Sequence, residues 1–248
     1  TMGDRYAVVN PAANAGLVEG MKGFFNPTGT ISRQFKSGMM GEGVLGYDEV
    51  AMSQSINTFT TGSRSLTDTI LVNGAVSTQG ATTISIDGGT GSATVLVGDV
   101  FTIANVYAVN PQTRQTTGSL QQFVVTAANT ASGGAWTSIA VSPAMYTSAH
   151  ALATINAFPA DNAAVTFLGT ASTVYPQNLA FQKNAITFAT ADLLLPQGVD
   201  MASRQVHNGI SLRIVRQYDI NNDRMPCRLD VLYGYSAIRP SMATRIWG

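Results

Sequence analysis

The chain has 248 residues and a mass of 26.0 kDa, which suggests one or two domains. Only 11% of the residues are charged, less than half of the roughly 25% usual in soluble domains, and the net charge is zero. This balance argues against nucleic-acid binding by phosphate neutralisation, and a hydrophobic content of 45% argues against disorder. A surface with so few charges is poorly protected against association, so the protein either associates by design or sits inside a larger assembly.

Cys227 is the only cysteine, so no intrachain disulfide can form, and a lone thiol favours a reducing compartment. The first five residues do not resemble a signal peptide. The longest uncharged stretch, between Arg114 and Asp161, is too polar to cross a membrane. We therefore expect no membrane partner.

Charge divides the chain into three parts. Residues 66–182 contain five charged residues in 117 positions, whereas the other 131 positions contain 23. A shift in composition that starts and stops in this way indicates one domain inserted into another. We expect a discontinuous α+β body, made of residues 1–65 and 178–248, and an inserted domain, residues 66–177.

The first part predicts helices followed by a strand. Asn10 is a suitable N-cap and Pro11 a suitable first residue for a helix that ends at Asn26-Pro27. A second, shorter helix is expected from Thr30 to Met39, before a run of glycines breaks it. Residues 50–59 look extended.

The middle part predicts β structure. Short Thr- and Val-rich segments alternate with turn signals, which is typical of a small sandwich or barrel. The expected strands cover residues 83–86, 95–97, 100–109, 122–127, 136–141 and 164–168.

In the last part we expect a short helix over residues 178–185 and an extended segment over 186–189. Residues 210–214 and 227–233 alternate between apolar and polar and are joined by a turn-like segment, so they predict a hairpin. Cys227 falls on the apolar side of its strand, where a buried position is expected.

Two motifs resemble ligand-binding loops. Gly41, Gly43 and Gly46 match G-x-G-x-x-G, but the predicted helix precedes and the strand follows, which is the wrong order for a dinucleotide site. Asp219, Asn221 and Asp223 match a calcium loop in part, yet Arg224 stands where that loop needs glycine.

The two histidines, His150 and His207, have neither metal-ligand spacing nor a nucleophile elbow nearby. We expect no catalytic residue, no cofactor and no metal site, and hence no enzyme.

Four arginines cluster around the predicted hairpin: Arg213, Arg216, Arg224 and Arg228. One interpretation is ion pairing between subunits or contact with packaged nucleic acid. The other is pairing within the chain, with Asp219, Asp223 and Asp230 on a solvated face.

Two groups of segments resemble a known family. The segments 178–186, 210–219, 228–234 and 239–240 resemble the C-terminal region of coat proteins from short-tailed bacteriophages of the P22 type. The segments 97–101, 110–113 and 117–118 resemble the inserted β-barrel domain of those proteins. The likeness covers most of the chain in the same order, and the chain looks like the C-terminal portion, because the family's N-terminal arm, extended hairpin and spine helix have no counterpart in it.

The resemblance implies a structural major capsid protein of the tailed-phage capsid fold, which self-assembles through pentamers and hexamers into an icosahedral shell around the genome. The implied inserted domain aids folding and contacts neighbouring subunits. Further implied partners are scaffolding and portal proteins and, non-specifically, packaged nucleic acid, with assembly in the host cytoplasm. The candidate subunit-interface residues are Arg33, Glu42, Asp48, Arg114, Arg213, Arg216, Arg224 and Arg228.

Two other classes of function stay open. A β-rich phage tail or adhesin-type protein could bind through the middle part, since Thr-, Ser- and Gly-rich β domains are common in such proteins. An enzyme with carboxylates far apart in sequence is the least favoured, because every catalytic motif fails.

Overall fold

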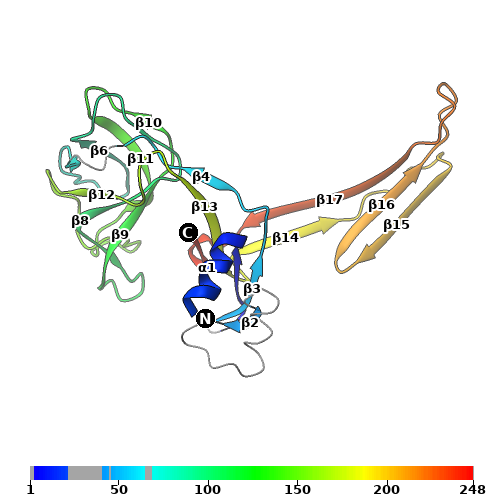
Figure 1. Cartoon of the computed structure of the whole chain (residues 1–248), viewed down its shortest axis with the longest axis horizontal. Helices are drawn as coiled ribbons and strands as arrows, with labels where there is room; N and C mark the ends of the chain where they lie inside the picture. The colour runs from blue at the N-terminus through cyan, green and yellow to red at the C-terminus, as the bar shows by residue number, and fades with distance from the viewer. Residues whose placement is uncertain (1–2, 22–40, 45, 65–68, 248) are drawn as a thin grey trace. The chain divides into compact units, whose positions relative to one another are not determined.

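The computed structural model describes residues 3–21, 41–44, 46–64 and 69–247. The protein is mostly β, with 52% of its residues in strands and 6% in helix. Contacts divide the chain into two compact units: unit 1 comprises residues 1–56 and 178–248, and unit 2 comprises residues 57–177. The sequence-based division lies at 65–66 and 177–178. Figure 1 shows the elements of both units, and each unit is described by itself.

Unit 2 is built on a six-stranded antiparallel sheet of order β12-β8-β9-β11-β6-β5. Its two end strands meet, because Val72 N donates to Ala163 O and Val165 N donates to Ile70 O. The sheet therefore closes into the barrel that the alternating pattern predicted (Figure 1). The strands are β5 (Leu71–Val72), β6 (Ala81–Asp87), β8 (Val100–Val109), β9 (Thr116–Val125), β11 (Trp136–Met145) and β12 (Val165–Phe167). A separate pair joins β7 (Thr94–Val95) to β10 (Asn129–Thr130).

The barrel encloses a contiguous core of 19 buried apolar residues. Trp136 is fully buried within it, and its indole Nε1 donates to Ala93 O at 3.0 Å, so its polar atom is satisfied. Phe101 packs against Phe123 and Phe167, with ring centroids 5.8 and 5.3 Å apart. The segment before the barrel forms β4 (Thr58–Thr60), which pairs with the first residues of β13 (Val174–Gln182).

Unit 1 contains a small sheet of order β18-β13-β1-β3-β2. Parallel strands β1 (Arg5–Val9) and β3 (Tyr47–Met52) flank α1 (Pro11–Met21), the single α-helix of the described residues. Asn10 caps that helix as predicted, because its Oδ1 accepts from Ala13 N at 2.9 Å. The other elements are β2 (Gly41–Val44), the 3-10 helix η1 (Pro240–Met242) and β18 (Ala243–Trp247).

One helix expected in unit 1 is a strand, and another lies outside the described residues. The helix expected over residues 178–185 is wrong: residues 178–182 belong to β13, whose Leu179–Gln182 pair with β1. Pairing along β1 overrides the local helix preference, and Asn178 and Ala180 are buried on alternate positions, as in a strand. The expected helix over residues 30–39 and the helix end at Asn26-Pro27 lie outside the described residues.

A four-stranded antiparallel sheet of order β14-β17-β16-β15 completes unit 1. Its strands are β14 (Ile186–Ala191), β15 (Met201–His207), β16 (Ile210–Arg216) and β17 (Cys227–Ala237). The predicted hairpin is the β16–β17 pair, whose register runs from Leu212↔Val231 to Arg216↔Cys227. The first half of β17 pairs with β16 and its second half, Leu232–Ala237, pairs with β14. No helix in the described residues is long and apolar enough to span a membrane.

Candidate subunit-contact sheet

The four-stranded sheet of unit 1 has one apolar face. Odd-numbered residues of β17 from Leu229 to Tyr235 are large and apolar, while the even-numbered residues include Arg228, Asp230 and Ser236. Residues directly opposite one another in a sheet share a face, so the register adds apolar residues of the neighbouring strands to the same side. We call this the apolar face: Ile186, Phe188, Met201, Ile210, Leu212, Leu229, Val231, Tyr233 and Tyr235.

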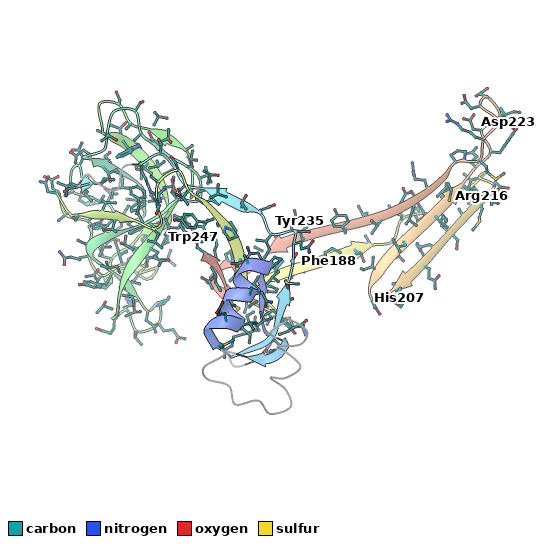
Figure 2. The ribbon with its side chains drawn as sticks, in the orientation of Figure 1. Phe188, His207, Arg216, Asp223, Tyr235 and Trp247 are labelled. Carbon is teal, nitrogen blue, oxygen red and sulfur yellow. The ribbon has the colours of Figure 1, made fainter. Side chains whose placement is uncertain are left out.

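The apolar face is exposed. Its nine side chains are between 36% and 77% accessible, with Tyr235 the most accessible. Figure 2 shows Phe188 and Tyr235 on adjoining strands of this sheet, and the Phe188 and Tyr233 rings stack with centroids 6.0 Å apart. A sheet normally buries one face against a second layer, so this sheet lacks a layer within the described residues.

The opposite face carries most of the sheet's ion pairs. Arg213 donates to Asp230 Oδ2 from Nε at 3.1 Å and from Nη2 at 2.5 Å, while Arg228 Nε lies 2.8 Å from Asp230 Oδ1. These hydrogen bonds, from Arg213 first and then Arg228, lower the pKa of the Asp230 carboxyl below its ordinary value. We call this the charged face; Val206, Val215 and Leu232 also lie on it.

A comparison with family models matches the chain to "P22 coat protein - gene protein 5" over residues 1–248. The chain belongs to the P22 coat protein family. Its function is that of a structural protein of a phage capsid, as the resemblance implied. Among solved structures, the chain is similar to the "CUS-3 coat protein I-domain", with 28% identity over 41% of this chain and 96% of that one, at a TM-score of 0.31. No curated protein matches the chain.

In this coat protein, the four arginines of the hairpin all have partners within the chain. Besides Arg213 and Arg228 on Asp230, Arg216 pairs with Asp200 at 2.9 Å and Arg224 with Asp219 at 3.6 Å. Only Arg213 and Arg228 come together on one carboxylate. Asp223, expected as an arginine partner, instead accepts from the Tyr218 hydroxyl at 2.7 Å, which raises the pKa of Tyr218.

The remaining candidates belong to other elements of the chain. Arg114 is exposed in the turn between β8 and β9, with a left-handed φ of 55°. Asp48 accepts a hydrogen bond from Arg5 N at 2.6 Å, and Glu42 stands opposite Glu49 in the β2–β3 pair. Arg33 lies outside the described residues.

Asp219 and His150, two of the residues with possible chemistry, have structural partners. Asp219 accepts from Asn221 N and Asn222 Nδ2 in the β16–β17 connection, and these bonds and that of Arg224 lower its pKa. The His150 ring stacks on Tyr146 with centroids 4.5 Å apart. Across the described part of the chain, no group of three His, Cys, Asp or Glu residues fits a metal ion.

The expectation that Cys227 is buried is wrong, because the cysteine is exposed. The alternation placed it on the correct side of β17, but nothing in the described residues covers that side. The same alternation marks which residues share the apolar face, but a local pattern does not tell an exposed face from a buried one.

Sequence reasoning also missed a buried ion pair in unit 2. Arg64 Nη1 lies 2.6 Å from Asp99 Oδ1, and both side chains are fully buried. Burial lowers the pKa of Arg64, and Asp99 opposes that shift. The two residues are 35 positions apart, so no local pattern could reveal the pair.

Proposed function

We propose that this chain forms part of the wall of an icosahedral phage shell, with copies arranged in pentamers and hexamers, and that its role is structural rather than catalytic. The observation that carries the proposal is the exposed apolar face of a sheet in a coat-family chain. We propose that coat-protein polypeptide covers this face in the assembled shell.

The size of the apolar face supports this proposal. The exposed fractions of its nine side chains add up to about four and a half whole side chains. At about 150–250 Å² per large side chain, this is roughly 700–1,100 Å². A standard protein interface buries about 800 Å² on each partner. The face therefore has the area that one specific contact needs.

We propose that unit 2 is the inserted domain of the coat protein. Unit 1, made of residues 1–56 and 178–248, is then the capsid body. A closed barrel with its own core supports an independent folding role for unit 2. Its exposed Arg114 is a candidate for contact with a neighbouring subunit, as are Arg33, Glu42 and Asp48 in unit 1. Scaffolding and portal proteins, and packaged nucleic acid bound non-specifically, are the further proposed partners, with assembly in the host cytoplasm.

The arginines of the hairpin have a different proposed part. Since Arg213, Arg216, Arg224 and Arg228 each pair within the chain, their first contribution is to hold the sheet and its connections in place. These arginines contribute to subunit contacts indirectly, by stabilising the sheet whose apolar face contacts another subunit.

The native thiol of Cys227 tests the covering of the apolar face, because Cys227 is exposed and lies on that side of β17. Maleimide should label Cys227 rapidly in the isolated chain and slowly in assembled shells, with labelled peptides identified by mass spectrometry. A cysteine introduced as Leu152→Cys, at an exposed position of unit 2, serves as the control and should react in both states. Equal labelling of Cys227 in chain and shell would refute the proposed covering.

A further inference from the structure

The connection between β14 and β15 presents an uncommon apolar segment. Residues 193–196 read Leu-Leu-Leu-Pro, and we call them the leucine segment. Leu194 is 85% exposed, more than any other large apolar side chain among the described residues, and Leu195 is also exposed. An exposed run of leucines usually marks a site of interaction.

Two arginines hold the backbone of the leucine segment. Arg204 Nη1 donates to Leu193 O at 3.3 Å, and Arg213 Nη1 donates to Leu194 O at 2.5 Å. Arg204 also pairs with Asp192, just before the segment, at 3.5 Å. Neighbouring strands β15 and β16 thus bind two consecutive carbonyl groups, which fixes the backbone from which Leu194 projects.

The register shows why this arrangement is specific. Arg204 and Arg213 stand directly opposite one another in the β15–β16 pair, and like charges so placed repel each other. Asp230, next to Arg213 across β16–β17, and the two carbonyl groups supply the acceptors that the arginines need. The leucine segment therefore lies over the charged face and completes its hydrogen bonding.

We propose that the leucine segment is a contact between coat subunits, in which Leu194 packs into an apolar surface of a second copy of this chain. The inference rests on the proposed function and adds a second contact, on the side opposite to the apolar face. Bonds from both arginines order the segment before binding, so less entropy is lost when Leu194 is buried.

The chemistry of the leucine segment favours a second copy over other partners. Beside the segment, Arg204, Arg213 and Arg228 share the carboxylates of Asp192 and Asp230, which leaves one positive charge. The side chain that projects, Leu194, carries no charge, and every copy of the chain exposes an apolar face against which it can pack. The leucine segment thus offers an apolar side chain on a fixed backbone, and burial of apolar surface is the main favourable contribution to protein association.

The first test compares two substitutions in the coat protein co-expressed with its scaffolding protein. Leu194→Ser should lower the yield of shells by about tenfold, because the lost contact recurs at every copy. The thermal unfolding midpoint of the purified chain should not change, since Leu194 is exposed. The control is Leu152→Ser, which removes an exposed leucine of unit 2 and should leave the yield at the wild-type value.

The second test places a photoreactive amino acid at position 194 and irradiates purified shells. A coat–coat dimer on a denaturing gel, with the cross-link mapped from position 194 to another copy, is the expected result. Cross-links only within one chain, to scaffolding protein or to DNA, or a wild-type yield from Leu194→Ser, would overturn the inference. Failure of the complete wild-type coat protein to form shells would instead overturn the proposed function.

Discussion

Arg64 and Asp99 form a fully buried ion pair in unit 2, with 2.6 Å between Arg64 Nη1 and Asp99 Oδ1. Arg64 Nη2 also donates to Leu168 O at 2.5 Å, and its guanidinium lies 4.9 Å from the centre of the Phe167 ring. Asp99 accepts from Gly62 N and Leu96 N as well. The pair therefore connects the segment before the barrel, which contains Gly62 and Arg64, to the loop at Leu96–Asp99 and to the chain at Leu168.

Removing one partner of this pair should destabilise unit 2 strongly. Arg64→Met leaves the Asp99 carboxylate buried without its cation, which typically costs about 3–5 kcal/mol of unfolding free energy. Urea unfolding followed by Trp136 fluorescence, in a Trp247→Phe background, measures the loss. The double variant Arg64→Met/Asp99→Asn should lose less than Arg64→Met, because no buried charge remains. An unfolding free energy of Arg64→Met within about 1 kcal/mol of the wild-type value would contradict the role assigned to the ion pair.

Gly89 is expected to tolerate no side chain. A Cβ at this position would lie 2.3 Å from the Trp136 ring, and Trp136 is fully buried in the barrel core. Gly89→Ala should therefore cost about 1–3 kcal/mol through overpacking. Gly16→Ala is the matched control, because that glycine lies in α1 with open space around its Cβ position, and alanine should raise helix stability by up to about 1 kcal/mol. Chemical denaturation measures whether Gly89→Ala lowers the free energy of unfolding and whether Gly16→Ala raises it.

The barrel and the predicted hairpin could be inferred from sequence because their signals are local. Alternation with period two marked residues 210–214 and 227–233, and turn residues separated the strands of unit 2. Strand β15 was missed since Met201–His207 has no apolar alternation and four of its seven residues are polar. The Arg64–Asp99 pair and the β13–β1 pairing depend on contacts distant in sequence, which no local pattern reports.

The apolar face and the leucine segment were only half predictable for a similar reason. An alternating strand identifies which residues share a face, but it does not say whether that face meets a core or a partner. Cys227, which was expected to be buried, and Tyr235 lie on the same side of β17, and both are exposed. Leu194 sits in a connection, where apolar periodicity gives no signal.

The stability of the four-stranded sheet should depend on pH through Asp230. Arg213 and Arg228 lower the folded-state pKa of this carboxyl, so their contribution is complete above the unfolded pKa of about 3.9 and is lost as the pH falls through the folded value. Asp230→Asn should lower the thermal midpoint near neutral pH. The gap between variant and wild type should narrow below about pH 4. Circular dichroism melts across this range provide the measurement, and a gap that widens in acid would contradict the assignment.

Tyr235 should matter for assembly rather than for folding. It is 77% exposed on the apolar face, so Tyr235→Ser should leave the unfolding midpoint of the isolated chain unchanged and reduce its self-association. In a covered face, burying a large side chain contributes about 1.5–3 kcal/mol, so shells of the variant should form at lower yield and dissociate at lower denaturant concentration.

Leu232→Ser is the matched control for Tyr235→Ser, because Leu232 is an exposed apolar residue of the same strand on the opposite side. If the apolar face carries the larger contact, the control should form shells at a higher yield than Tyr235→Ser does, because only the smaller contact of the leucine segment lies on its side of the sheet. Sedimentation of shells through a sucrose gradient separates the two expectations. Equal defects in the two variants would mean that β17 needs apolar residues for its own folding, and the covering of one particular face would have to be abandoned.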